Sequence, residues 1–241
     1  MANDTFEVFS YYEKMDDKEI KELLDEHIRS MVALLKNRKI RMVRYILEKF
    51  ASIKDKLATL DEGKILRVAL LFHDLGKVFY QAQDLESKEM KRYVFTGHEL
   101  ISAFIFDMLR EELVLHYNYD TDLLDAILFA ILYHHHAMNV KLRRIVVPEE
   151  SYNALKKNID KVRKYLIEIL KKVIDDEVII MAFEKTFDRL VDIIQRSPLD
   201  TFITDVTREI REIRARLWRK FIGNTAFRLL ALALTNVVTI L

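Results

Sequence analysis

The chain has 241 residues, of which 51% are hydrophobic and 32% charged, so it is long and apolar enough to bury a substantial core. Only four glycines and two prolines are present, which argues against an all-β fold with many tight turns and favours an all-α fold of long helices. The net charge of +1 excludes a global basic field for binding nucleic acid, and the absence of cysteine excludes disulfides and thiolate metal sites.

The sequence shows neither a secretory signal nor an uncharged apolar run of about 18 residues, so we expect a cytoplasmic protein with no membrane contact. The abundance of Lys, Glu, Asp, Ile and Leu is a compositional hint of a thermophilic source.

The N-terminal part predicts an arm followed by two helices. Residues 1–16 are expected to form a loosely held arm, and Asp16 or Asp17 to cap a helix that runs to about Leu35. His27 lies on the apolar face of that helix, where a single histidine is more often a core residue than a ligand. The basic residues between 36 and 44 are interpreted as a solvated helix face in preference to a phosphate-tracking surface.

The next helix ends in the stretch Leu70-Leu71-Phe72-His73-Asp74-Leu75-Gly76-Lys77, around which the rest of the chain is expected to be organised. A histidine and an aspartate side by side in an apolar setting are costly unless a partner such as a divalent metal compensates them. Gly76 suits a helix C-terminal turn, and Lys77 then directs a cation at an anion held by the metal. The alternative for this dipeptide alone is a buried histidine hydrogen-bonded to its neighbour.

Two further histidine sites follow. Residues 78–95 are polar and predict a surface loop, after which His98 falls in the first turn of a new helix. A helix beginning near Asp120 ends in His134, His135 and His136. Three successive histidines cannot all face one way on a helix, but two at its fraying end can reach a shared centre. We therefore favour metal binding over an incidental cluster.

The C-terminal part is predicted to be helical throughout. Lys141, Arg143 and Arg144 form a basic cluster close to the histidines. Helices from Pro148 to about residue 173 and from about 175 to 195 carry no identifiable chemistry, and are expected to form a hairpin laid on the body. Helices from about 200 to 221 and from 225 to 238 complete the chain, the last one containing Asn236.

The order His27, His73-Asp74 with Lys77, His98, the histidine triplet and Asn236 resembles that of the HD-domain metal-dependent phosphohydrolases. Within them it is most similar to the stand-alone HD nuclease of type I CRISPR interference systems. The matching stretches are residues 24–28, 70–77, 97–99, 133–137 and 229–238. The resemblance implies a single helical HD domain over residues 1–241, with a helical insertion at about 148–200.

The resemblance also implies a site for two divalent metals, chosen among Mn, Ni, Co, Fe and Mg. One metal would take His27, His73, Asp74 and a late carboxylate, which in this chain is replaced by the neutral Asn236. The second would share Asp74 and add His98 and two histidines of the triplet, either His134 and His135 or His135 and His136. Asp74 and Lys77 are the catalytic candidates, and Lys141, Arg143 and Arg144 the candidates for guiding a nucleic-acid backbone.

The function that the resemblance implies is hydrolysis of phosphodiester bonds in single-stranded DNA, RNA or R-loop strands, as an exonuclease or an endonuclease. A separate helicase subunit and an RNA-guided interference complex in antiviral defence would be the partners. The alternatives are an HD-class nucleotide phosphohydrolase or cyclic-nucleotide phosphodiesterase, and a non-catalytic helical adaptor, which Asn236 makes conceivable.

Overall fold

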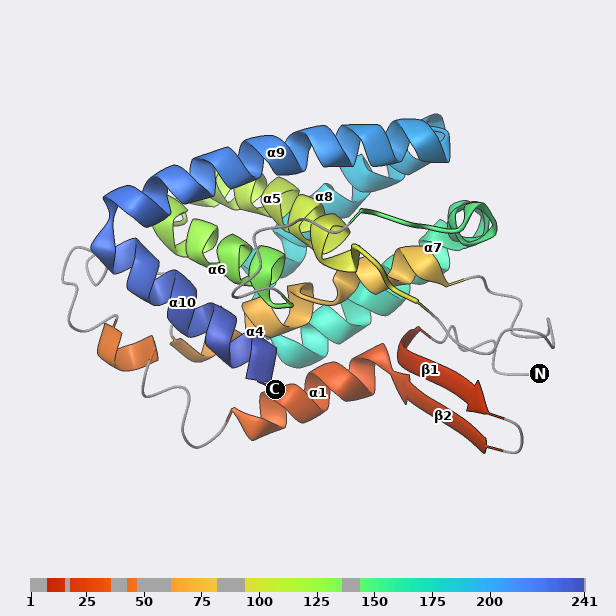
Figure 1. Cartoon of the computed structure of the whole chain (residues 1–241), viewed down its shortest axis with the longest axis horizontal. Helices are drawn as coiled ribbons and strands as arrows, with labels where there is room; N and C mark the ends of the chain where they lie inside the picture. Colours follow the sequence, from red (N-terminus) through yellow and green to blue (C-terminus); the bar gives the residue numbers. More distant parts are fainter. Residues whose placement is uncertain are drawn as a thin grey trace.

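The computed structural model describes residues 8–15, 18–35, 43–46, 62–81, 94–135 and 144–240. The prediction of a helical fold is confirmed, with the addition of one small two-stranded sheet (Figure 1). The strands are β1 (Phe9–Met15) and β2 (Lys18–Leu23). The helices are α1 (Leu24–Leu34), α4 (Glu62–Phe72), the 3-10 helix η2 (Leu75–Tyr80), α5 (His98–Tyr117), α6 (Thr121–Tyr133), α7 (Glu149–Val173), α8 (Glu177–Arg196), α9 (Leu199–Gly223) and α10 (Thr225–Ile240).

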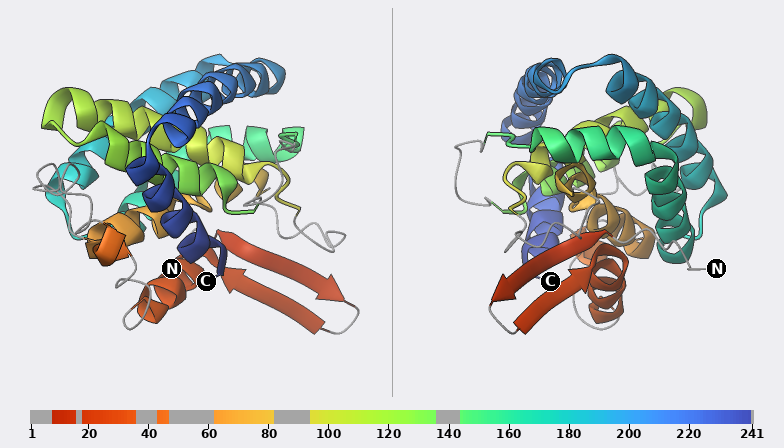
Figure 2. Two further views of the ribbon diagram at one scale, coloured as in Figure 1. Left: turned by 60° about the vertical axis from the view of Figure 1, so that its left-hand side comes forward. Right: turned by 90° about the vertical axis from the view of Figure 1, so that its right-hand side faces the viewer.

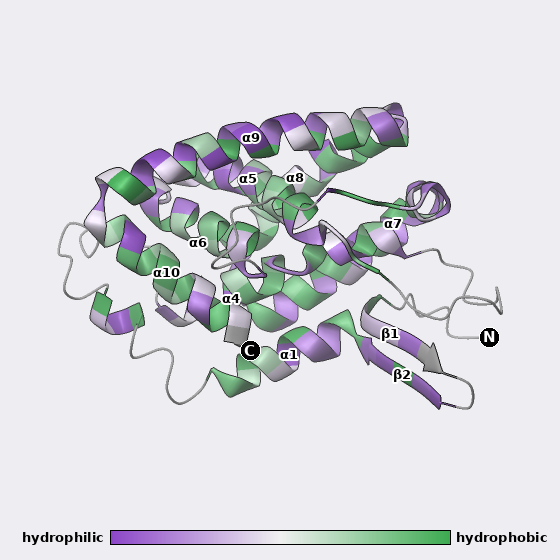
Figure 3. Ribbon diagram, viewed as in Figure 1, coloured by the Kyte–Doolittle hydropathy of each residue, from purple (hydrophilic) through white to green (hydrophobic). Residues whose placement is uncertain are grey.

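Helix α6 is the centre of the core. From Leu123 to Tyr133 every side chain is buried, as expected for a helix that is apolar all round. It packs against α4, α5 and α10, and its N-terminus is capped by the Asp120 carboxylate, which accepts a hydrogen bond from the Leu123 amide. Figure 3 shows α4 and α6 as largely hydrophobic, whereas α9 alternates between hydrophobic and hydrophilic residues. His134, at the C-terminal end of α6, is therefore buried in the interior of the protein.

Helices α7 and α8 pack directly onto the elements that carry the predicted site. Asp176 caps α8 by accepting hydrogen bonds from the amides of Val178 and Ile179. Helix α8 contacts α5, and α7 contacts η2, so that Leu155 and Ile159 share one core with Leu75, Phe79 and their neighbours. Side chains of α7 and α8 thus pack against the buried side of η2. That they are an insertion in a single domain stays a prediction.

Buried ion pairs attach the long helix α9 to α5 and α6. The carboxylate of Asp125 is fully buried and lies 2.5 Å from both Arg110 Nε and Lys220 Nζ. Arg216 of α9 lies 2.5 Å from Asp107 of α5. These cations of α9 are consequently occupied in compensating buried acids.

No single helix among the described residues is long and apolar enough to cross a bilayer; α9 and α10 satisfy that length and composition only when taken as a pair, which is bent by 118°.

The structure corrects the prediction for the N-terminus. Residues 18–23 form a strand, so the helix that was expected from Asp16 or Asp17 begins only at Leu24. Part of the expected loose arm is the partner strand, residues 9–15, and the Leu24 amide donates to the Val8 carbonyl where the two segments meet α1. The hairpin projects from the helical body beside α1 (Figure 2). Residues 1–7 lie outside the described part of the chain.

Candidate metal centre

Asp74 is the hub of the predicted site. It lies between α4 and η2, its side chain is 3% exposed, and it belongs to two groups of potential ligands. One group consists of Asp74, His98, His134 and His135, and the other of His27, His73 and Asp74; within each group the ligand atoms lie within 4.8 Å of one another. One carboxylate is therefore shared by two sets of imidazoles.

The imidazoles approach the two oxygens of Asp74 from different sides. Oδ1 lies 3.0 Å from His98 Nε2 and 3.9 Å from His134 Nε2. Oδ2 lies 3.2 Å from His73 Nε2 and 3.4 Å from His27 Nε2. His135 Nε2 lies 3.2 Å from His98 Nε2.

The other ring nitrogen of three of these histidines is held by the backbone. Nδ1 lies 2.6 Å from the Leu70 carbonyl in His73, 2.7 Å from Phe95 in His98 and 2.7 Å from Ile131 in His134. A neutral imidazole that donates from Nδ1 carries a lone pair on Nε2. In that tautomer the Nε2 lone pairs of the three histidines face the Asp74 carboxylate.

This arrangement fits a divalent cation. Lone pairs that converge on a carboxylate repel one another and the carboxylate unless a cation lies among them, and the donors are nitrogen and oxygen atoms of the kind first-row metals prefer. Asp74 Oδ1 and His134 Nε2 are both buried without a hydrogen-bond partner, a state that is costly for a polar atom in a protein interior. Metal coordination would remove that cost.

Electrostatics places these groups in the protonation states of metal ligands. Burial acts to raise the pKa of Asp74, but the positive charge of His73 in its protonated form and that of Lys77 outweigh it and hold that pKa well below its ordinary value. Burial, followed by the nearby His73 and His135, lowers the pKa of His134 well below its ordinary value of 6.5. An ionised carboxylate and a neutral imidazole are the forms that bind a metal.

Gly76 allows η2 to lie against the start of α5. A Cβ atom at this position would lie 2.2 Å from the His98 carbonyl oxygen and 2.9 Å from the Ser102 amide nitrogen. The Gly76 amide donates to Ser102 Oγ at 2.8 Å. The expected role of Gly76 in a helix C-terminal turn is therefore replaced by a close backbone approach, which fixes Asp74 relative to His98.

Lys77 is engaged with Asp74. Its Nζ lies 2.7 Å from Asp74 Oδ2 and donates to the Ser10 carbonyl at 3.1 Å, with the Phe95 ring 5.4 Å away. Its positive charge thus lies beside Asp74 Oδ2, the oxygen that His27 and His73 also approach.

Two residues that the sequence interpretation missed complete the surroundings of His27. Glu22 Oε2 lies 3.1 Å from His27 Nδ1, and Ser10 Oγ donates to the same oxygen at 2.7 Å. Both residues belong to the hairpin, and no sequence signal pointed to them because the segment was interpreted as an arm and a helix.

The remaining candidates are placed only in part. His136, Lys141 and Arg143 lie outside the described residues. Arg144 is exposed, and its carbonyl oxygen would lie 2.6 Å from a Cβ on Gly97, next to His98. Asn236 is exposed on α10, one turn before Thr239, whose hydroxyl donates to the His134 carbonyl at 2.6 Å. The roles of these residues stay predictions.

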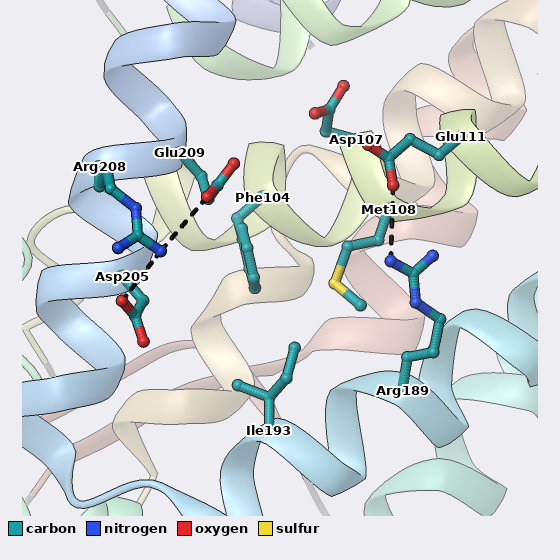
Figure 4. A pocket seen from close by; sticks show the side chains of 9 residues that line it. All are labelled: Phe104, Asp107, Met108, Glu111, Arg189, Ile193, Asp205, Arg208 and Glu209. Carbon is teal, nitrogen blue, oxygen red and sulfur yellow. Dashed lines mark ion pairs between the residues drawn. The ribbon is translucent and has the colours of Figure 1, made fainter.

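A separate pocket of about 320 Å³ between α5, α8 and α9 contains none of the candidate ligands (Figure 4). Phe104, Met108 and Ile193 give it an apolar surface. Arg208 at its rim is paired with Asp205 and Glu209, and Arg189 with Glu111. Its charges are therefore largely matched within the chain.

Five histidines surround one buried aspartate on this helical scaffold. This donor set is typical of metal-dependent hydrolases. The family model described as "HD domain" matches residues 40–183, which is more than half of the chain, so the chain belongs to the HD domain family.

Among solved structures, the chain is similar to the CRISPR-associated Cas3 HD domain protein MJ0384 from Methanocaldococcus jannaschii. The two are 18% identical, with a TM-score of 0.47, over 91% of this chain and 95% of that one. No curated protein matches the sequence.

Proposed function

We propose that this protein is a metal-dependent nuclease that hydrolyses phosphodiester bonds of single-stranded DNA, with two divalent metals at the centre. The observation that supports it is the sharing of Asp74 between two ligand sets. When bound, two metals supply charge to hold and polarise a phosphate and to activate water for in-line displacement.

The ligand residues and their exposure indicate the kind of substrate that the site would accept. Asp74, His98, His134 and His135 would hold one metal, and His27, His73 and Asp74 the other. The side chain of Asp74 is 3% exposed and that of His27 22%, and His135 is exposed, so each ligand set contains one imidazole that is more accessible than the shared carboxylate. That arrangement supports an extended substrate crossing the site in preference to a small molecule enclosed by it.

Two groups would act on the substrate's charge. Lys77 keeps a cation against Asp74, which offsets negative charge that accumulates on a phosphate during displacement. Arg144, exposed beside the start of α5, would bind the backbone of the strand together with Lys141 and Arg143.

The role in CRISPR interference, in the cytoplasm and alongside a separate helicase and an RNA-guided complex, rests on the order of the motifs in the sequence. The same site with a different substrate would make the protein an HD-class nucleotide phosphohydrolase or cyclic-nucleotide phosphodiesterase.

The test is cleavage of end-labelled single-stranded DNA with Mn²⁺, beside a panel of nucleotides and cyclic nucleotides. Asp74→Asn preserves the shape of the side chain and removes its charge, and Asp192→Asn on the exposed part of α8 is the matched control. We expect metal-dependent DNA cleavage that is lost in Asp74→Asn and kept in Asp192→Asn. Turnover of nucleotides with DNA intact would contradict the nuclease and support the phosphohydrolase. Activity toward neither, in folded protein, would support the adaptor.

A further inference from the structure

The N-terminal hairpin carries an irregularity next to the metal centre. Phe9 pairs with Leu23 and Tyr11 with Glu22, so Ser10 is left as an extra residue between two pairs. Regular alternation would place Ser10 on the face opposite Phe9, yet both are buried, at 4% and 2% exposure, whereas Tyr11 is exposed. A bulge of this kind re-aims a side chain, and here it turns Ser10 toward the site.

The bulged strand is fixed to the body on the side of η2. The side-chain amide of Gln81 accepts from the Phe9 amide and donates to the Phe9 carbonyl, both at 2.8 Å. The Ser10 carbonyl accepts from Lys77 Nζ at 3.1 Å. The hydroxyl of Ser10 is thereby held in place, and it donates to Glu22 Oε2 at 2.7 Å.

His27 needs an acceptor from outside its own helix. His73 and His134 follow the last residues of α4 and α6 and use carbonyls of the last turns of these helices. His98, which begins α5, uses the Phe95 carbonyl in the segment before that helix. His27 lies within α1, where the carbonyls of the preceding turn are engaged in helical hydrogen bonds. Glu22 Oε2 lies 3.1 Å from its Nδ1 and can accept from it.

We propose that Glu22, aligned by Ser10, is a positioning residue for the ligand set His27, His73 and Asp74. By accepting the Nδ1 proton of His27, it selects the tautomer whose Nε2 lone pair faces Asp74, 3.4 Å away. An outer carboxylate of this kind orients a histidine and increases its basicity toward a metal. The inference rests on the proposed metal centre and adds the hairpin to it as a functional part.

The consequence is confined to one of the two ligand sets. Without Glu22, the His27 ring is free to rotate or to carry its proton on Nε2, and it no longer offers a fixed lone pair. His98 and His134 keep their own backbone acceptors. Metal binding by Asp74, His98, His134 and His135 is therefore expected to persist.

The experiment is calorimetric titration of the full, metal-stripped chain with Mn²⁺ alone. The variants are Glu22→Ala, Glu22→Gln and Ser10→Ala. Glu19→Ala is the matched control, because it removes an exposed carboxylate three positions earlier on the same strand, at the position that pairs with Lys14. Thermal unfolding of each variant by circular dichroism shows whether the hairpin and body remain folded.

We expect two Mn²⁺ per wild-type chain, and in Glu22→Ala an affinity at least about tenfold weaker for one of them with the other unchanged. Glu22→Gln retains an amide oxygen that accepts the Nδ1 proton and should restore most of the affinity. Ser10→Ala should be intermediate, and Glu19→Ala should match wild type.

Equal Mn²⁺ binding by wild type and Glu22→Ala would overturn the inference and leave the proposed function standing. An equal loss in Glu22→Gln and Glu22→Ala would overturn the positioning role in favour of a simple loss of charge. Absence of Mn²⁺ binding by the wild type would overturn both proposals.

Discussion

Replacing Gly76 by alanine tests whether close approach of two backbones sets the geometry of the metal centre. The added Cβ would lie 2.2 Å from the His98 carbonyl oxygen, whereas real Cβ contacts essentially never fall below 3.0 Å. η2 and the start of α5 would therefore have to separate by at least 0.8 Å, the difference between these two distances. Because Asp74 lies two residues before Gly76, the separation would widen its distance from His98.

The structure also sets the size of the effect. The blocking atoms belong to the backbone of a packed helix, so relief by a side-chain rotation is unavailable, and the cost should reach the upper part of the overpacking range, about 3 kcal/mol. For a chain of this length, that lowers the melting temperature by roughly 6–12 °C. A displacement near 1 Å in a catalytic constellation costs on the order of 100-fold in rate.

The assay compares Gly76→Ala with Gly223→Ala, whose Cβ would meet nothing within 4 Å. We expect only Gly76→Ala to melt earlier in calorimetry and to bind Mn²⁺ more weakly. A Gly76→Ala protein with the melting temperature and Mn²⁺ affinity of the wild type would refute the reasoning.

Three further changes probe the same region. Lys77→Met leaves the Asp74 carboxylate buried without its cation, so it should destabilise the metal-free protein by about 3 kcal/mol and the Mn²⁺-loaded protein by less. Equal losses of stability in calorimetry with and without Mn²⁺ would contradict this expectation. Because burial lowers the pKa of His134 below 6.5, the unfolded chain takes up a proton first as the pH falls. The contribution of His134 to the free energy of unfolding is complete above pH 6.5 and decreases below it by at most about 1.4 kcal/mol per pH unit. Thermal melting in the presence of a chelator should show this slope in wild type and a smaller slope in His134→Gln. Gln81→Leu removes both hydrogen bonds to the Phe9 backbone, which costs about 1–3 kcal/mol for each buried group left unpaired. Hydrogen exchange should become faster in the hairpin but not in α6. Unchanged exchange in the hairpin would contradict the role of Gln81 in fixing β1 to the body.

The helices were predictable because their apolar faces recur at helical spacing. The burial of α6 follows from a segment with hardly any polar residue, and the start of α5 at His98 from the glycine before it. The convergence of His73 and His98 on Asp74 could be expected only through the order of motifs, since nothing in the local sequence states which helix ends meet. Family membership and helical fold were thus accessible from sequence.

The hairpin was not predictable, for a physical reason. In β2, Ile20 and Leu23 fall at helical spacing with Leu24 and His27, which favours a helix, and the strand shows no alternation of buried and exposed residues. Its strand conformation comes from pairing with β1, a long-range contact that overrides local preference. As part of one helix, Glu22 would lie five residues before His27, a spacing that puts the two side chains on different faces, so nothing in the sequence indicated that Glu22 would reach the ring.

The hydrogen bond from Thr239 to the His134 carbonyl has a consequence for the order of folding. It joins residues 105 positions apart, and the clamp between Gln81 and Phe9 joins residues 72 apart. Such contacts form late, because closing a long loop costs entropy before any contact repays it. The ligand groups from His27 to His135 all precede α10 in the chain, so during synthesis the His134 backbone lacks this support until that helix has been made. We therefore expect the metal centre to reach its final geometry only once α10 has packed against α6.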